Sequence, residues 1–171
     1  GMQASKVIPT YKHFPGLGRV KDNTDTSAGV VDSTTNRLPD AAVGVFSNAI
    51  AAGAQVIMVS SATYSLIDPS APAVFSSTIV TDMLRTQMGF SGVVITDDVS
   101  AAVQVQDVSA GGRAERAIRA GCDLVRASAD PTVAADMVKA LIATARSDPA
   151  FAARVDESAT RVLNLKKSLQ P

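Results

Sequence analysis

The sequence predicts an α/β protein with a parallel sheet, made of four units in which a strand is followed by a helix. Continuous apolar runs of strand length occur at 55–60 and 93–96, and a further strand is expected at 123–126. Such runs are typical of strands that are buried on both faces of a parallel sheet. Helical patterns separate these strands and no hairpin signal joins them, so they connect through crossovers.

The first unit is interrupted by a long polar segment. We expect a short extended strand at 11–14, a polar loop at 18–39, and a helix at 41–52 for which Asp40 is the N-cap. A loop of about twenty residues is too long for a plain connection and is usually functional or disordered. The segment therefore marks a region of interest beside the first strand.

The later helices are predicted from caps and glycine stops. They are expected at 78–88 after Ser77, at 112–120 before Gly121, from Asp130 to residue 146, and at 156–169. With their strands, they complete four strand-helix units.

Two closures of such a sheet compete, an open doubly wound sheet and part of a (β/α)₈ barrel. A complete barrel usually takes about 250 residues, so the 171 residues of this chain supply about half of one. No Gly-x-Gly-x-x-Gly follows the first strand, which weakens the dinucleotide-binding form of an open sheet.

Composition excludes several classes of function. Sixteen basic and sixteen acidic residues give a net charge of zero, and aromatic residues make up only 4% of the chain. A nucleic-acid partner is therefore not expected, since such proteins need basic surfaces or aromatic platforms. Cys122 is the single cysteine, which rules out an intramolecular disulfide and a cysteine-based metal site. No apolar run approaches the length of a membrane-spanning helix.

Polar side chains are expected where the strands end, which is where parallel α/β folds place their functional groups. They are Lys12, His13, Ser60, Ser61, Asp97, Asp98 and Arg126. A carboxylate directly after an apolar strand has a fixed backbone and a partly dry setting, which suit a nucleophile or an electrostatic stabiliser. The alternative for the aspartate pair is that one caps the next helix and the other is solvated.

The other candidate residues can also be interpreted either as functional or as structural. Lys12 can donate to substrate hydroxyls or form a salt bridge to Asp97, and a lone histidine such as His13 is more often structural than catalytic. The acidic and amide residues of the polar loop suit turn chemistry, and their spacing does not match a calcium loop. These residues are Asp22, Asn23, Asp25 and Asp32.

Two motifs give the chain a family resemblance. Lys-His-Phe-Pro-Gly-Leu-Gly at 12–18 resembles the Lys-His-Phe-Pro-Gly-His-Gly signature of glycoside hydrolase family 3 β-N-acetylhexosaminidases. Thr-Asp-Asp-Val at 96–99 resembles the segment that carries the nucleophile of that family. Segment 55–60 resembles the family's strand between these motifs, 119–124 resembles the Ala-Gly-x-Asp strand after them, and 161–166 is similar to the C-terminal helix of the barrel. The resemblance covers nearly the whole chain in the right order, and the two main motifs together are specific.

The resemblance implies that residues 1–171 form the C-terminal half of a TIM-like catalytic barrel, with about its fifth to eighth strands. It implies that Asp97 attacks the anomeric carbon and that Lys12 and His13 bind hydroxyls of an N-acetylglucosamine ring. Asp98 is then a neighbour at the substrate site that orients or caps. The implied reaction needs no metal or organic cofactor.

One departure concerns proton transfer. Members of this branch use an Asp-x-His pair as general acid/base, whereas the corresponding stretch here is Asn23-Thr24-Asp25 and position 17 is Leu. Asp25 is one candidate for the role, since a carboxylic acid serves in most glycosidases. It would have to hold its proton near neutral pH, which requires desolvation. The other outcome is a weak or missing acid, so that only substrates with good leaving groups react well.

The expected function is a retaining hydrolase that removes terminal β-linked N-acetylglucosamine from peptidoglycan or chitin fragments. Two alternatives stay open. One is a family 3 β-glucosidase or β-xylosidase. The other is an inactive half-barrel that only self-associates or binds sugar. Its two sheet edges would be unpaired unless a missing N-terminal half or a second copy closed the barrel.

Overall fold

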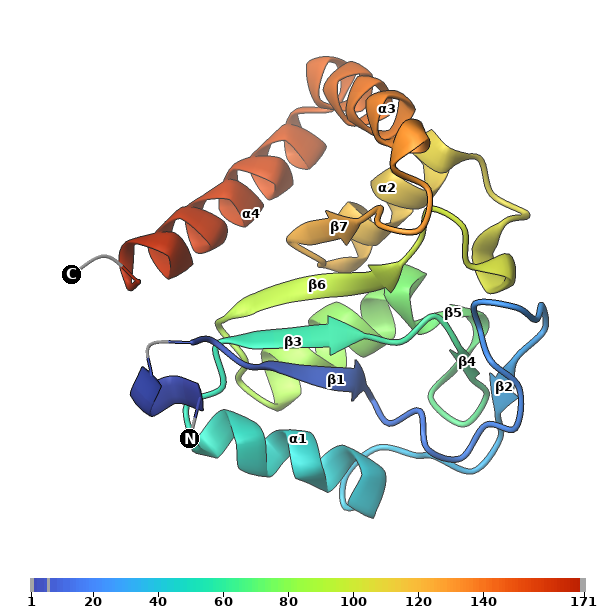
Figure 1. Cartoon of the computed structure of the whole chain (residues 1–171), viewed down its shortest axis with the longest axis vertical. Coiled ribbons are helices and arrows are strands. Elements are labelled where there is room, and N and C mark those ends of the chain that lie inside the picture. Colours follow the sequence, from blue (N-terminus) through green and yellow to red (C-terminus); the bar gives the residue numbers. More distant parts are fainter. Residues whose placement is uncertain (1, 6, 170–171) are drawn as a thin grey trace.

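The computed structural model describes residues 2–5 and 7–169, and its main feature is a parallel sheet of four strands (Figure 1). In the sheet the strands stand in the order β1 (Thr10–Phe14), β3 (Val56–Val59), β6 (Val93–Asp98) and β7 (Leu124–Arg126). The predicted parallel α/β fold is therefore confirmed. The order follows the chain and does not reverse among these strands, whereas a doubly wound sheet contains a reversal.

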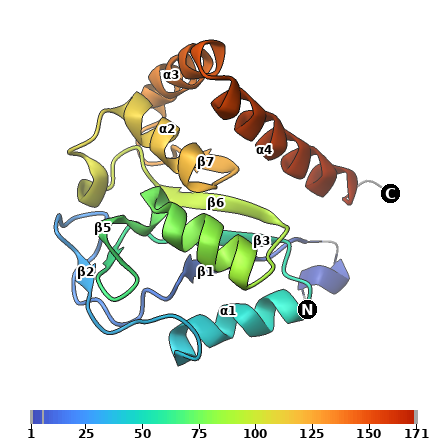
Figure 2. The same ribbon diagram turned by 180° about the vertical axis from the view of Figure 1, so that it is seen from behind.

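Helices follow the strands of the sheet. The longer ones are α1 (Ala41–Ala51), η3 (Thr78–Gln87), α2 (Ala110–Ala120), α3 (Ala134–Ser147) and α4 (Pro149–Lys167). Single turns of helix lie at η1 (Met2–Ser5), η2 (Ala73–Phe75), η4 (Val103–Val105) and η5 (Pro131–Val133). Figures 1 and 2 together show η3 and α2 on the same face of the sheet. Over the described ranges, every helix falls short of the length and apolarity that crossing a bilayer demands.

Helix caps account for most of the observed boundaries. Asp40 caps α1 as predicted, and its carboxylate accepts a hydrogen bond of 2.8 Å from the Ala42 amide. Helix η3 begins at Thr78 with Ser77 at the N-cap position, as predicted, but the Ser77 side chain makes no capping hydrogen bond. The Ser76 hydroxyl accepts from the Ile79 amide at 3.1 Å instead.

Two of the predicted helices, at 112–120 and 156–169, begin earlier in the structure than expected. Helix α4 begins at Pro149 rather than at residue 156, because the Asp148 carboxylate caps the amides of Ala150 and Phe151. Helix α2 likewise begins at Ala110, two residues before the predicted start. In both cases a polar cap and the helix dipole favour a start that the apolar pattern does not reveal.

A second, small sheet was not predicted. It contains β2 (Val31–Asp32), β4 (Thr63–Tyr64) and β5 (Asp68–Pro72), and β4 pairs with β5 in antiparallel orientation. The expected absence of hairpins holds within the main sheet, whose pairs are all parallel, but the β4–β5 hairpin outside it was missed. The Tyr64 carbonyl accepts from the Ile67 amide at 3.0 Å in the turn between β4 and β5, and the Asp68 carboxylate at the start of β5 accepts from Ser70 and Ser76. The small sheet lies beyond the carboxyl ends of the main strands (Figure 1).

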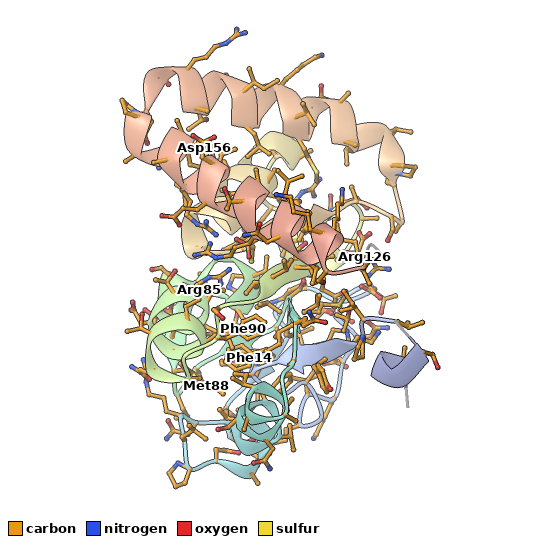
Figure 3. The ribbon with its side chains drawn as sticks, turned by 90° about the vertical axis from the view of Figure 1, so that its left-hand side faces the viewer. Phe14, Arg85, Met88, Phe90, Arg126 and Asp156 are labelled. Atoms are coloured by element: carbon orange, nitrogen blue, oxygen red, sulfur yellow. The ribbon has the colours of Figure 1, made fainter. Side chains whose placement is uncertain are left out.

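The core lies between the main sheet and the helices that cover it. Phe14 and Phe46 meet edge to face, with their ring centroids 5.2 Å apart, and Figure 3 shows Phe14 and Phe90 in the interior. The chain leaves β1 at Gly16, whose φ is +137°. A side chain there would be strained, and its Cβ would lie 2.8 Å from the Cβ of Ala42, so the turn after β1 requires glycine.

A buried ionic cluster joins the sheet to the helices at the amino end of β7. The carboxylate of Asp123, with no exposed side-chain surface, pairs with Arg85 of η3 at 2.6 Å and with Arg154 and Arg161 of α4 at 2.8 and 3.2 Å. The Val94 amide also donates to it at 2.9 Å. Burial alone would raise the pKa of Asp123, but these partners hold it below the ordinary value. The carboxylate is therefore ionised at neutral pH.

The two outer strands of the sheet, β1 and β7, each pair on one side only among the described strands. Beside β7 lies an apolar cavity of about 370 Å³ between α2, α3 and α4. Its apolar lining includes Ile118, Leu124, Leu141, Val162 and Leu163. Because β1 and β7 are each paired on one side only among the described strands, their outer sides have backbone groups that another strand can pair with.

Candidate active site

A polar cavity of about 540 Å³ lies at the carboxyl ends of β1, β6 and β7. It is lined by Lys12, His13, Leu17, Val20, Lys21, Asp22, Asn23, Thr24, Asp25, Asp97 and Arg126. Four of the five predicted site residues, Lys12, His13, Asp25 and Asp97, are thus brought together from segments far apart in the sequence. Asp98 is not part of the lining.

Asp97 sits at the end of β6 with only 8% of its surface exposed. Its Oδ1 accepts a hydrogen bond of 2.8 Å from the Asp98 amide and lies 3.2 Å from Nη1 of Arg126. Its Oδ2 lies 3.4 Å from Nε2 of His13. Oδ1 is therefore held by two donors, whereas Oδ2 has one longer contact and is the freer oxygen for a reaction.

The ion pair suggested between Lys12 and Asp97 is wrong. Lys12 lines the same cavity, but the cationic partner of Asp97 is Arg126 at the end of β7. The backbone of Arg126 is fixed, because its amide donates to Thr96 Oγ1 at 2.9 Å and its carbonyl accepts from the Val99 amide at 3.1 Å. Figure 3 labels this arginine. The sequence placed it at a strand end but assigned it no role.

His13 is half-buried beside the carboxylate. Burial lowers the pKa of His13 below its ordinary value; the charge of Asp97 opposes this shift and the nearby Lys12 cation adds to it. At neutral pH the imidazole is therefore uncharged. A neutral ring can donate one N–H, to Asp97 or to a sugar hydroxyl, without cancelling the negative charge of the carboxylate.

Asp98 has a different task from its neighbour. Its carboxylate accepts six hydrogen bonds of 2.7–3.1 Å, three from Ser100 and Ala101 and three from Ser128 and Ala129. Although burial would raise its pKa, these donors hold the pKa of Asp98 well below its usual range. The carboxylate ties the loop after β6 to the loop after β7, which matches an orienting role rather than contact with substrate.

We expect Asp98→Asn to lower the free energy of unfolding by about 3 kcal/mol or more, because an amide nitrogen would face N–H donors and leave them unpaired. Urea unfolding followed by circular dichroism measures the loss. Since the folded pKa is depressed, the contribution is complete above about pH 5, begins to fall near the unfolded pKa of about 4, and is lost only as the pH falls through the lower folded pKa. Asp107→Asn, on an exposed turn nearby, is the control; an equal effect of the two changes would contradict this role.

The polar loop carries Asp25 to the rim of the cavity. Asn23 organises the turn, since its Oδ1 accepts from the Asp25 amide at 2.8 Å and its carbonyl accepts from the amides of Thr26 and Ser27. Asp25 itself is exposed. The carboxylate of Asp32, farther along the loop, accepts hydrogen bonds from Thr34 and Thr35 in a local turn, as turn chemistry predicts.

Comparison with known proteins identifies the family. Residues 1–165 match the model of the glycosyl hydrolase family 3 N terminal domain. The chain belongs to glycosyl hydrolase family 3. The family resemblance of the two motifs is thereby confirmed.

Among curated relatives, a beta-hexosaminidase of Psychromonas ingrahamii is 40% identical over 134 residues, which are 76% of this chain and 39% of that protein. The solved beta-N-acetylhexosaminidase of Beutenbergia cavernae is 58% identical with a TM-score of 0.95, over 97% of this chain and 49% of that one. A family 3 beta-N-acetylglucosaminidase from a Paenibacillus species is 29% identical with a TM-score of 0.85, over 98% of this chain and 32% of that one. The chain thus spans about half the length of these relatives or less.

Proposed function

We propose that this chain supplies the nucleophile side of the active site of a retaining β-N-acetylhexosaminidase. The observation that carries the proposal is the setting of Asp97. Its side chain is nearly buried at a strand end, lies between Arg126 and His13, and lines the same polar cavity as Lys12 and Asp25. The names of the family 3 relatives support N-acetylglucosamine as the sugar.

The wider proposal for the fold is that the four strands are the second half of a (β/α)₈ barrel. Two features support it. The strands follow the chain order without reversal, and β1 and β7 each lack a neighbour on one side among the described strands. In a closed barrel both edges are paired by the strands of the first half. The alternative closure, by a second copy of this chain, would use the same two edges.

In the proposed first step, Oδ2 of Asp97 attacks the anomeric carbon from the face opposite the leaving group. The bond from that carbon to the leaving oxygen breaks through an oxocarbenium-like transition state, and Asp25 gives its proton to the departing oxygen. Because Asp25 is exposed in the free chain, the proposal requires the bound sugar to shield this side chain from water. Arg126 and the Asp98 amide keep Oδ1 fixed so that Oδ2 points at the sugar. The uncharged imidazole of His13 and the side chain of Lys12 donate hydrogen bonds to ring hydroxyls.

In the second step a water molecule attacks the same carbon from the side that the leaving group has vacated. The Asp25 carboxylate removes a proton from this water, and the carboxylate of Asp97 leaves. Two inversions at one carbon give net retention. The natural substrates that we propose are terminal β-linked N-acetylglucosamine residues of peptidoglycan or chitin fragments.

A panel of 4-nitrophenyl β-glycosides tests the proposal with the full-length protein. We expect the N-acetylglucosaminide to be hydrolysed with a kcat/KM about tenfold or more above the glucoside and xyloside, since the acetamido group contributes specific contacts. Proton NMR is expected to show the β-anomer of the sugar as the first product. A preference for glucose or xylose, an α-anomer first, or no turnover of any member would each overturn the proposal.

A further inference from the structure

We propose that Gln104 is a positioning residue that holds the loop carrying Asp25 against the active site. The inference rests on the proposed function, because it assigns Gln104 a part in proton transfer by Asp25. It follows from contacts between two segments that lie far apart in the sequence, the loop at 23–30 and the turn of helix η4 after β6.

Gln104 contacts both ends of this loop. At the first end, its backbone amide donates to the carbonyl of Thr24 at 3.1 Å. At the other end, its side chain pairs with the peptide of Val30: Oε1 accepts from the Val30 amide at 2.8 Å, and Nε2 donates to the Val30 carbonyl at 3.2 Å. One residue therefore closes the loop by three hydrogen bonds.

The contacts next to Gln104 strengthen this closure. The neighbouring Val103 amide donates to the carbonyl of Asp25 itself at 3.1 Å. Thr24 and Val30, the two anchored residues, are buried with 3% and 4% of their surface exposed, whereas Asp25 is exposed at the cavity. The Val30 carbonyl also accepts from the Thr63 amide of β4 at 3.0 Å. The acidic side chain is thus attached to a backbone that is fixed on both sides.

The primary amide of glutamine is needed for this contact. It supplies a donor and an acceptor side by side, which is what pairing with both backbone groups of one residue requires. Glutamate would keep the acceptor for the Val30 amide but would turn a carboxylate oxygen toward the Val30 carbonyl. Leucine, with a similar volume, can make neither bond.

The position of the loop matters because a general acid must lie within hydrogen-bond reach of the leaving oxygen. A displacement of about 1 Å can lower a rate by about 10²-fold. Correct placement of the acid matters most for leaving groups that are strong bases, because these depart only when protonated. A loosened loop therefore harms poor leaving groups more than good ones, and this pattern separates positioning of the acid from a general loss of structure.

The test compares Gln104→Leu and Gln104→Glu with Gln106→Leu in the full-length protein. Gln106 is a matched control, since its Nε2 donates only within its own segment, to the carbonyls of Ser100 and Ala102 at 3.1 and 3.3 Å. The substrates are methylumbelliferyl and 2,4-dinitrophenyl N-acetyl-β-glucosaminides. For Gln104→Leu we expect kcat/KM to fall by about tenfold to 10²-fold with the first substrate and by less than about threefold with the second. For Gln104→Glu we expect kcat/KM to fall in the same pattern. For Gln106→Leu we expect kcat/KM with either substrate to change by no more than about twofold.

Hydrogen exchange gives a readout that does not depend on activity. Residues 24–30 are expected to exchange faster in Gln104→Leu than in Gln106→Leu, with the main sheet unchanged. Equal losses with both leaving groups, or unchanged exchange in this segment, would overturn the assignment. Asp25→Asn in the same substrate series separates the two proposals. If it is sensitive to the leaving group while the Gln104 variants are not, only the role of Gln104 fails; if it is insensitive, proton transfer by Asp25 fails as well.

Discussion

Replacing Asp97 with alanine is expected to lower kcat for 4-nitrophenyl N-acetyl-β-glucosaminide by about 10⁴-fold or more, because no other carboxylate of the site is held at the end of a strand between two donors. The variant should fold, since the Asp97 side chain lies at the cavity and not in the apolar core. Steady-state kinetics with the full-length protein measure the loss. Asp107→Ala, on an exposed turn outside the cavity, is the control and is expected to keep its activity.

Azide adds a stereochemical readout to the same variant. In Asp97→Ala the small anion can occupy the space of the missing carboxylate and attack the anomeric carbon from that face. The product is then the α-glycosyl azide, which NMR identifies. Normal turnover of the variant, or rescue that gives the β-azide, would contradict the assignment of Asp97 as the nucleophile.

Replacing Asp25 with alanine is expected to have the second-largest effect, and the size should depend on the leaving group. For methylumbelliferyl N-acetyl-β-glucosaminide we expect kcat/KM to fall by about 10²- to 10⁴-fold, which is the usual contribution of general acid catalysis. With the 2,4-dinitrophenyl substrate the first step needs little protonation, so kcat/KM should change by less than about tenfold. Initial rates over a series of aryl leaving groups measure this dependence.

The azide product distinguishes the two carboxylates. In Asp25→Ala the nucleophile is intact, so azide attacks the glycosyl-enzyme from the side of the departed leaving group and gives the β-glycosyl azide. Wild-type kinetics across the whole series would show that a group other than Asp25 transfers the proton. The opposite configurations of the two azides assign the two roles independently of how large each rate loss is.

The main sheet could be predicted because its strands carry a strong local signal. Strand β3 and the first part of β6, residues 93–96, are largely apolar runs of strand length, and burial on both faces is the environment that such runs require. The small sheet could not, since Asp68–Pro72 contains two prolines and no β-branched residue. It exists because the Ile67 amide donates to the Tyr64 carbonyl in the turn and because β4 pairs with β5.

The candidate site was predictable only where a strand end determines the position of a side chain. Asp97 and His13 follow directly from the ends of β6 and β1, and the structure places them 3.4 Å apart. The contribution of Gln104 could not be inferred, because its partner Val30 lies 74 positions away and neither residue belongs to a motif. Such contacts depend on the folded arrangement of two loops, and a local pattern carries no record of them.

The cluster around Asp123 has a consequence for how the molecule tolerates change. It lies at the opposite end of the strands from the polar cavity and links η3 and α4 to the sheet through Arg85, Arg154 and Arg161. The ionic cluster therefore stabilises the amino end of the sheet, whereas the candidate active site lies at its carboxyl end. Substitutions in the loops that line the polar cavity are therefore expected to leave the arginine-bound carboxylate, and the packing of η3 and α4 on the sheet, unchanged.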